Sequence, residues 1–396
     1  MRKITLIFKL FLVVCGLLIG NINVWAASVQ HFGGNEQTSW TTSSGTTGIL
    51  PGSTVTLKGL VMTFGGSTEG TLADQWDWNS KNNGVVSNMP NAGTESSGVT
   101  SVAIGDNVPA FGGTYKFVPS TTGVLSIGVK GGGPGNTSAD GKLYLVTVDE
   151  YNKIEEIVAS KGGYNTAQTE TYHLIAGKTY YFFQCATKSD RVTGYRLTLK
   201  NISYQTSFTK EVTAAGYATF SSAYPLDLDN ISGATAYIVK ADAASGDNIV
   251  ITPQTGKVAA NTGLILKGDA GTVTIPVAAS GTDISATNKL VAVTADATPI
   301  AVGDYVLGAA TDNSNVGLYR LTSATNLNKG QAYLPGGFSS VKVLNFIIEG
   351  ETPTSVEAPA VAEAEEEGVL YNTAGQQVTA DYKGIVIKNG KKYLNK

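Results

Sequence analysis

The sequence predicts an all-β protein that comprises two antiparallel β-sandwich or jelly-roll-like domains and a small C-terminal β-hairpin-like tail. Glycine accounts for 47 of the 396 residues, about 12% against a usual figure near 7%. Methionine and histidine are scarce, with 3 and 2 copies. Short apolar–polar alternations recur between turn-forming residues, and hardly any segment has helical periodicity. Short strands joined by tight turns are therefore expected throughout the chain.

The first expected domain covers residues 27–205, and its strands follow a period of two. Residues alternate between apolar and polar in Tyr115–Phe117, Leu125–Val129 and Leu143–Val146. One face of each strand can then be buried while the other faces solvent. Several such strands with turn signals between them favour an antiparallel sandwich or a jelly roll.

A turn signal at Ala176–Lys178 separates two further apolar runs of this domain, Tyr172–Leu174 and Thr179–Phe183. This spacing predicts a β-hairpin. Another strand is expected at Gly194–Leu199. The segment Asp149–Ala159 fits either one helical turn or a further strand.

The second expected domain covers residues 206–348, beginning where a new run of alternation follows Tyr204–Thr209. Like the first domain, it contains short apolar–polar alternations between turn-forming residues. The expected strands lie at Gly216–Ser221, Ala236–Val239, Ile249–Ile251, Ala259–Leu266, Gly303–Leu307, Gly317–Arg320 and Lys329–Pro335.

Residues 1–26 predict a signal peptide. A basic start is followed by an apolar stretch that only Lys9 interrupts, and Val24–Ala26 is a small-residue cleavage pattern, so we expect cleavage near Ala26. Lipid attachment at Cys15 is the disfavoured alternative, because Val14 is bulky and more apolar residues follow. No later run reaches the roughly 18 apolar residues of a membrane span. We therefore expect a secreted or outer-surface protein without a transmembrane segment in the mature chain.

Charge and cysteine usage narrow the partners further. Removing Arg2, Lys3 and Lys9 with the leader leaves 28 − 3 = 25 basic residues against 31 acidic ones, a net charge of −6. Nucleic acid is an unexpected partner for such a chain. Cys185 is then the single cysteine, so no intramolecular disulfide is expected.

Residues 349–368 predict an acidic flexible linker that precedes a tail at residues 369–396. The linker segment Glu349–Glu367 has seven Glu, two Pro and neither Lys nor Arg, a composition typical of solvated, extended chain. The tail has five Lys against Asp381. Electrostatic display of a basic tail and simple solubility of a spacer explain this contrast equally well.

The tail also carries the most specific pattern in the chain. It reads V-L-Y-N-T-A-G-Q-Q-V and then K-G-I-V-I-K-N-G-K-K-Y. This pattern resembles the C-terminal sorting and attachment domains of extracellular Bacteroidetes proteins that use type nine secretion, although Val386 stands where that family usually has Tyr or Phe. The resemblance implies contact with secretion or attachment machinery through Tyr371, Asn372, Gly375, Gln376, Gly384, Gly390 and Lys391.

The two expected domains also resemble modules of proteins from the same bacteria. The texts A-G-K-T-Y-Y-F-F and G-Y-R-L-T-L in the first domain are similar to jelly-roll modules attached to secreted polysaccharide-degrading proteins. The strand texts of the second domain, in their order, resemble a β-rich accessory domain found near the C-termini of many surface proteins. That resemblance implies a spacer function for residues 206–348.

Catalytic patterns are weak in this sequence. His31 and His173 fall in no triad or metal-ligand spacing, and Cys185 follows a run of aromatics that favours a buried small hydrophobe. The pairs Asp149–Glu150 and Glu155–Glu156 could serve glycoside hydrolysis only if the fold placed two acids across a cleft. We therefore expect no enzyme, and a polysaccharide hydrolase or lyase is the enzyme alternative.

Two loop motifs are also discounted. Gly131–Gly135 lacks the Gly-Lys-Ser/Thr of a phosphate loop. Asn136–Gly141 lacks the first Asp of a calcium loop, and Thr147 stands where such a loop has Glu. No cofactor is expected, and a structural calcium ion held by scattered loop oxygens stays open without assigned residues.

The best functional indication is a pair of tryptophans, Trp76 and Trp78, with Asp74, Asp77 and Asn79 around them. A flat indole suits the apolar C–H face of a sugar ring, and the acids and amide suit its hydroxyls. The alternative is that these tryptophans fill the sandwich core.

Together these observations predict a non-catalytic protein that is secreted or displayed on the cell surface and binds a polysaccharide or another surface ligand through its first domain. A structural or adhesive protein without a sugar site is the main alternative. The sequence does not identify the ligand.

Overall fold

The computed structural model confirms the all-β prediction. It describes residues 30–32, 48–49, 54–57, 59–64, 76–79, 84–87, 101–108, 114–131, 142–162, 168–185, 197–310, 313, 315–351, 370–372, 376–379, 381–388 and 391–395. Within these residues every regular element is a strand. The contacts divide the chain into two compact units, unit 1 at Met1–Glu349 and the tail unit at Gly350–Lys396.

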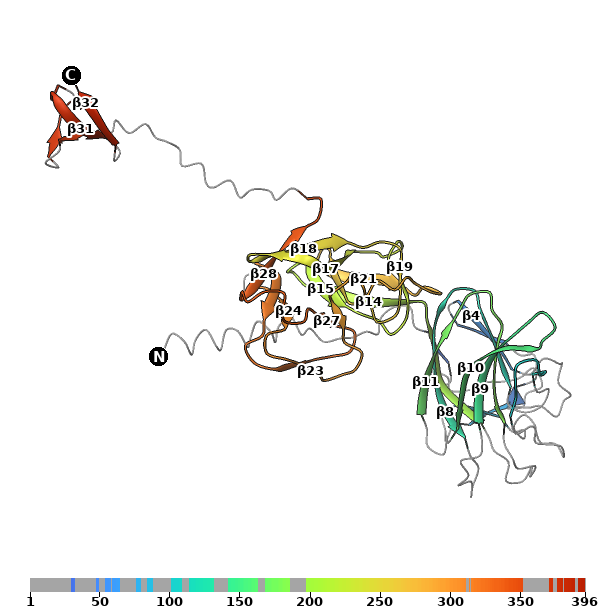
Figure 1. Ribbon diagram of the computed structural model, residues 1–396. Coiled ribbons are helices and arrows are strands. Elements are labelled where there is room, and N and C mark those ends of the chain that lie inside the picture. Colours follow the sequence, from blue (N-terminus) through green and yellow to red (C-terminus); the bar gives the residue numbers. More distant parts are fainter. Residues whose placement is uncertain are drawn as a thin grey trace. The chain divides into compact units, whose positions relative to one another are not determined.

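Residues 30–205 of unit 1 form a two-sheet structure that we call the sandwich (Figure 1). Its first sheet, sheet A, has the order β11-β8-β13-β6-β5-β2, and β1 also pairs with β13. All these pairings are antiparallel. The strands are β1 (Gln30–Phe32), β2 (Gly48–Ile49), β5 (Trp76–Asn79), β6 (Gly84–Ser87), β8 (Gly123–Gly131), β11 (Gln168–Leu174) and β13 (Leu197–Gln205).

The second sheet of the sandwich, sheet B, has the order β10-β9-β12-β7-β4-β3 and is likewise antiparallel. Its strands are β3 (Thr54–Leu57), β4 (Leu60–Phe64), β7 (Tyr115–Pro119), β9 (Lys142–Val148), β10 (Ile154–Gly162) and β12 (Tyr180–Cys185). The segment Asp149–Ala159, which the sequence left open, is a turn followed by β10.

The predicted alternation builds the core between the two sheets. Sheet A contributes Leu125 and Ile127, and sheet B contributes Phe117, Leu145 and Phe182; all five are fully buried. The ring of Phe182 lies 6.5 Å from that of Phe117, between centroids. The core therefore forms from the alternate positions that the sequence marks as apolar.

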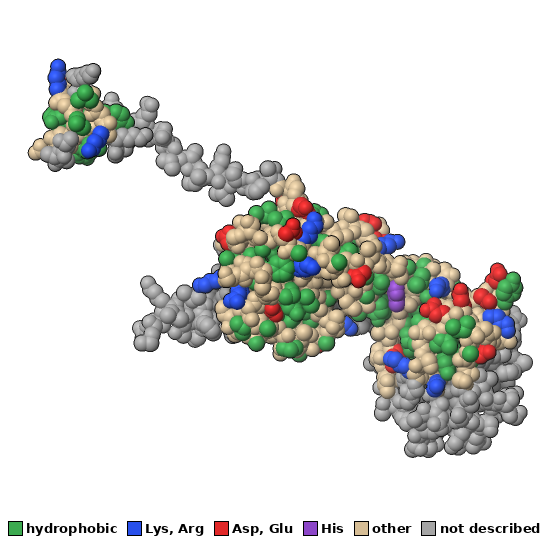
Figure 2. All heavy atoms as spheres, viewed as in Figure 1, with side chains coloured by type: hydrophobic (Ala, Val, Ile, Leu, Met, Phe, Trp, Pro, Cys, Tyr) green, Lys and Arg blue, Asp and Glu red, His purple; other side chains and the backbone are tan. Residues whose placement is uncertain are grey.

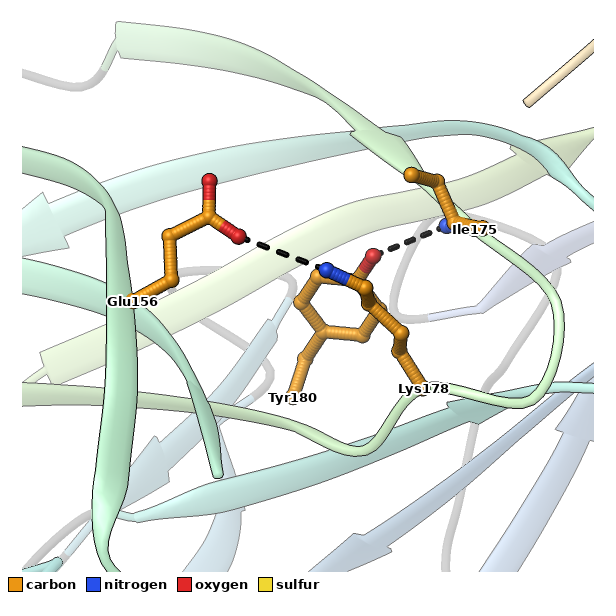
Figure 3. Close-up of polar contacts among 4 residues, drawn as sticks. All are labelled: Glu156, Ile175, Lys178 and Tyr180. Carbon is orange, nitrogen blue, oxygen red and sulfur yellow. Dashed lines mark hydrogen bonds and ion pairs between the residues drawn. The ribbon is translucent and has the colours of Figure 1, made fainter. Parts of the chain in front are cut away.

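The turn after β11 corrects the predicted hairpin. β11 pairs with β8 in sheet A, whereas β12 pairs with β7 and β9 in sheet B, so the chain crosses from one sheet to the other. The physical reason is that β12 has a neighbour on each side and offers β11 no free edge. Gly177 adopts a φ of +82°, and the Tyr180 hydroxyl accepts a 2.9 Å hydrogen bond from the Ile175 amide. Beside the Tyr180 ring, Lys178 Nζ lies 3.4 Å from Glu156 Oε2 (Figure 3).

Residues 206–348 of unit 1, which we call the second region, contain a larger sheet and four two-stranded ones. The larger sheet has the order β15-β20-β17-β18-β28-β25-β24, and the pairs are β14-β21, β16-β19, β22-β27 and β23-β26. The strands are β14 (Ser207–Val212), β15 (Tyr217–Phe220), β16 (Leu226–Asp227), β17 (Thr235–Ser245), β18 (Asn248–Pro253), β19 (Lys257–Val258), β20 (Leu264–Lys267), β21 (Gly271–Pro276), β22 (Val291–Ala292), β23 (Thr298–Ile300), β24 (Tyr305–Gly308), β25 (Gly317–Arg320), β26 (Thr325–Leu327), β27 (Ala332–Tyr333) and β28 (Val343–Ile348).

The second region departs from the expected all-antiparallel pattern at one pair. β18 and β28 run parallel, which is feasible because 89 residues of intervening chain connect Pro253 to Val343 and no tight turn has to join them. Separate apolar clusters form around Leu266, Tyr305 and Ile300. The second region therefore distributes its burial over three clusters, whereas the sandwich has one larger core between its sheets and a smaller cluster that includes Tyr144 and Phe183.

The tail unit is a four-stranded antiparallel sheet with the order β30-β29-β31-β32. Its strands are β29 (Leu370–Asn372), β30 (Gln377–Val378), β31 (Gly384–Lys388) and β32 (Lys391–Asn395). Among its described side chains Val386 is the one that is buried, at 3% exposure. Hydrophobic side chains are visible on its surface in Figure 2, and those exposed are Tyr371, Tyr382, Ile385, Tyr393 and Leu394.

Candidate functional site

A cleft of about 600 Å³ lies between the outer face of sheet A and loops of the second region, all within unit 1. This volume falls within the roughly 300–1,000 Å³ of pockets that hold small ligands. The side of sheet A is the sandwich wall, lined by Val124, Ser126, Thr171, Ser203 and Gln205. The opposite side is the loop wall, which includes Phe208, the segment 220–224, Asn261 and residues near 293–296 and 328–330.

The sandwich wall is the polar face of three adjacent strands. In the register of β11, β8 and β13, Thr171 stands opposite Ser126, and Ser126 also stands opposite Ser203. Their neighbours along the strands, Tyr172 and Leu125, belong to the core. Because strand positions alternate between faces, the same pattern that buries the apolar residues places a row of small hydroxyl side chains on the cleft.

A bulge in β13 is needed to complete this wall. The register between β13 and β8 shifts between Lys200 and Ser203, and Asn201 adopts a φ of +50° there. Leu199 lies in the core before the bulge, and Ile202 and Tyr204 lie in it afterwards. The extra residue thus reverses the alternation, so that Ser203 lines the cleft.

The segment 220–224 of the loop wall starts at the last residue of β15 and is fixed by hydrogen bonds. The Ser221 amide donates to the Gly330 carbonyl at 3.0 Å, and the Asn261 amide donates to the Ser222 carbonyl at 2.7 Å. The Ser221 hydroxyl donates to the Gln331 carbonyl at 2.8 Å. The segment 220–224 is therefore held in place before any ligand arrives.

Three aromatic rings line this loop wall. Tyr224 stacks on Phe208 with centroids 6.2 Å apart and an interplanar angle of 14°, and Phe208 lies 6.3 Å from Phe220. Tyr224 and Phe208 are half-buried. Together they give one side of the cleft an apolar, aromatic surface.

His173 joins the sandwich to the loop wall beside the cleft. Its Nε2 donates a 2.9 Å hydrogen bond to the Ala278 carbonyl of the second region, and its ring lies 5.9 Å from that of Tyr224. Burial lowers the pKa of His173 from its ordinary 6.5, and the hydrogen bond to Ala278 opposes that shift. The imidazole is therefore neutral near pH 7.

The lining of the cleft is close to neutral. Asp296 and Lys329 are its charged members, one of each sign, and both are exposed. The Asp296 carboxylate accepts a 3.1 Å hydrogen bond from the Lys329 amide. The visible face of unit 1 likewise shows basic and acidic side chains scattered among polar and apolar ones (Figure 2). The cleft can thus offer hydroxyl and amide groups to an uncharged polar ligand.

The predicted tryptophan site lies on β5. This strand places Trp76 opposite Ser87, Asp77 opposite Val86 and Trp78 opposite Val85, so the segment is extended as expected. Asn79 ends the strand. The side chains of these four residues, and the whole of Asp74, lie outside the described residues.

The structure brings two of the predicted tail residues together. The Asn372 Nδ2 donates to Gln376 Oε1 at 3.1 Å, and the Gln376 amide donates to Asn372 Oδ1 at 3.0 Å. Gly384 opens β31 with a φ of +139°, and Tyr371 is exposed. Gly375, Gly390 and the side chain of Lys391 lie outside the described residues.

Two of the four carboxylates considered for hydrolysis, Asp149 and Glu156, have structural partners. Asp149 accepts hydrogen bonds of 2.8 Å from the amides of Tyr151 and Lys153, which fixes the turn before β10. Glu156 lies 3.4 Å from Lys178. Neither carboxylate lines the cleft.

Several other features concern the described part of the chain only. No group of three or more His, Cys, Asp or Glu comes together there as a metal site would require. None of its segments forms a helix of the length and apolar character needed to cross a membrane. The side chains of His31 and Cys185 and the loop Asn136–Gly141 lie outside it.

The cleft itself was not predicted. Its residues run from Val124 to Gly330, so no local motif joins them. The available signal was weak: Ser126, Thr171 and Ser203 occupy polar positions of alternating strands, which usually means nothing more than a solvated face.

Searches of protein-family models, of curated proteins and of solved structures find no match to this chain.

Proposed function

We propose that this chain is a secreted or surface-displayed, non-catalytic binding protein that takes a glycan in the cleft of unit 1. The observation that carries this proposal is the pairing of an aromatic loop wall with a hydroxyl-lined sandwich wall across about 600 Å³. The tryptophan pair on β5 supplies a second candidate surface on the same sandwich.

Sugar rings have the complementary chemistry. A pyranose presents apolar C–H groups on its faces, which suit the rings of Phe208 and Tyr224, and hydroxyls on its rim, which suit Ser126, Thr171 and Ser203. Ligand sites of this kind combine apolar surface with a few placed polar groups. The near-neutral lining favours an uncharged glycan over an acidic one.

Two sequence features support display outside the cell. The signal-peptide pattern at residues 1–26 supports export, and the sorting-like tail supports handling by secretion or attachment machinery. Paired Asn372 and Gln376 and the apolar side chains exposed on the tail sheet are consistent with a unit that another protein handles.

A glycan array probed with the mature chain, residues 27–396, tests this function. We expect binding to at least one neutral polysaccharide and little binding to polyanions. Absence of any glycan signal would favour the structural or adhesive alternative. Incubation with pectins and plant glucans addresses the enzyme alternative, because new reducing ends or unsaturated products would contradict a non-catalytic protein.

A further inference from the structure

The cleft is built from both parts of unit 1. Of its eighteen lining residues, five belong to the sandwich and thirteen belong to the second region. The two parts contribute different chemistry. The sandwich wall supplies hydroxyl and amide side chains without an aromatic ring, and the loop wall supplies all three rings.

Contacts between the sandwich and the second region fix the positions of the two cleft walls relative to each other. His173 follows Thr171 by two positions on β11 and bonds to Ala278 of the second region. The Val277 amide next to Ala278 donates a 3.0 Å hydrogen bond to the carbonyl of Thr206, the first residue of the second region after β13, and so fixes the junction between the two parts. The ring of Tyr224 contacts His173. The row of hydroxyls therefore lies beside the aromatic wall without any rearrangement.

From this arrangement we propose that the second region supplies half of the glycan site and is not a spacer. A neutral pyranose lies with its C–H groups against the half-buried rings of Phe208 and Tyr224 while its hydroxyls bond to the sandwich wall and to Asn261 across the cleft. This inference rests on the proposed function, because it names the ligand class and the residues of that same cleft.

The choice of wall residues for substitution follows from their conformation. Asn261 is exposed and has a φ of +60°, a region that glycine also occupies without strain, so Asn261→Gly removes the amide and keeps the backbone. Thr171 is exposed on β11, and Thr171→Val removes its hydroxyl with little change of shape. Tyr224→Ala removes the half-buried ring that stacks on Phe208.

Matched controls come from outside the cleft. Thr169 is exposed on the same strand as Thr171 and does not line the cleft, so Thr169→Val is the control for Thr171→Val. Tyr151 is 75% exposed in the turn before β10, so Tyr151→Ala is the control for Tyr224→Ala. Melting curves establish that each variant is folded.

The experiment is calorimetric titration of the mature chain with cellohexaose, laminarihexaose, xylohexaose and mannohexaose. For the probe that binds, Thr171→Val and Asn261→Gly should each weaken affinity about three- to tenfold, the range of one hydrogen bond. Tyr224→Ala should weaken it on the order of tenfold or more. Both controls should bind as the unsubstituted chain does.

Three results would overturn the inference, and they differ in what they leave of the proposed function. Weaker binding on Thr171→Val together with unchanged binding on Asn261→Gly and Tyr224→Ala would assign the site to the sandwich alone. Binding lost only on joint substitution of Trp76 and Trp78 by Ala would move the site to β5, and the chain would still be a glycan-binding protein. Failure of every probe to bind the unsubstituted chain would overturn the inference and the proposed function together.

Discussion

Unit 1 and the tail unit are built from the same kind of short antiparallel strand, but they bury their side chains to very different extents. The sandwich alone encloses eighteen buried residues in one cluster. The tail sheet buries Val386 and leaves Tyr371, Ile385 and Leu394 exposed. The strand pattern therefore determines the secondary structure of both units. In the sandwich, sheet B also packs over sheet A, and this packing gives unit 1 a core of its own.

This difference has an energetic consequence. Burial of apolar surface contributes about 25 cal/mol per Å², and domains below about 40 residues usually need a partner, a metal or a disulfide for stability. The tail sheet spans Leu370 to Asn395 and falls below that size. Unit 1 should be stable alone, whereas the tail sheet should be marginal until something covers its apolar residues.

Deletion of residues 369–396 should produce the largest of the expected effects. The protein should no longer reach the cell surface, and the stability of unit 1 should not change. Because the contacts place the tail in a separate unit, the urea midpoint of unit 1 should not change. Surface labelling of cells that express the truncated chain should detect no protein outside. Undiminished display would remove the sorting function of the tail, and a lower midpoint would show that the two units depend on each other.

Truncation of a core ring should strongly destabilise unit 1. Phe182 is 0% exposed and contacts the rings of Phe117 and Tyr172. Phe182→Ala should lower the free energy of unfolding by about 3–5 kcal/mol in urea titration. Tyr151→Ala, at an exposed position, is the control and should have almost no effect. Similar losses in both variants would mean that the sandwich is not held together by this core.

A smaller effect is expected in the tail unit from Gly384→Ala. Gly384 has a φ of +139°, and a Cβ there would lie 3.3 Å from the Tyr382 ring. Strain at such a backbone position costs about 1–3 kcal/mol, enough to open a marginal sheet. Hydrogen exchange of β29, β31 and β32 should become faster, while unit 1 and the control Gln377→Ala should exchange as before. Unchanged exchange in the tail would mean that the sheet is more stable than its burial indicates.

The smallest effect should be a pH dependence at His173. Because burial lowers the folded-state pKa of His173 below 6.5, the unfolded chain takes up a proton first as the pH falls. The contribution of His173 to the free energy of unfolding should therefore become less favourable as the pH falls below about 6.5. It should stop changing below the folded-state pKa. His173→Gln keeps a donor for Ala278 and does not titrate. The melting temperature of the unsubstituted chain should fall relative to this variant between about pH 7.5 and pH 5, and parallel curves would contradict the assignment.

The strands of this protein could be predicted from the sequence because apolar residues recur between turn signals, and burial alternates with a period of two in β4 and β7. The expected solvent face was wrong for β9, because Leu143 and Leu145 lie in the core while Tyr144 and Val146 are buried in a second cluster. Leu125–Val129 and Leu143–Val146, both expected as strands, lie in β8 and β9. Which strands pair with one another could not be predicted as well from the sequence. The turn at Gly177 was recognised, but whether it joins neighbours or crosses between sheets depends on which strand edges are free, and no local signal carries that information.

For the same reason, the candidate site could not be predicted from local sequence patterns. Thr171, Tyr224 and Lys329 meet at one cleft although long stretches of chain separate them. The bulge at Asn201 reverses the alternation of β13, and neither its presence nor its position follows from the composition of the segment. The tryptophan pair on β5 was easier to notice because its residues are adjacent in the sequence, and it stays a prediction.

A crystal structure of the mature chain, soaked with the neutral oligosaccharide that binds best in titration, shows directly whether the cleft is the glycan site. We predict density for a pyranose in the cleft, with its ring against Tyr224 and a hydroxyl within hydrogen-bonding distance of Thr171 or Ser203. An ordered sugar on β5 or elsewhere on unit 1, beside an empty cleft, would show that the glycan site is not the cleft.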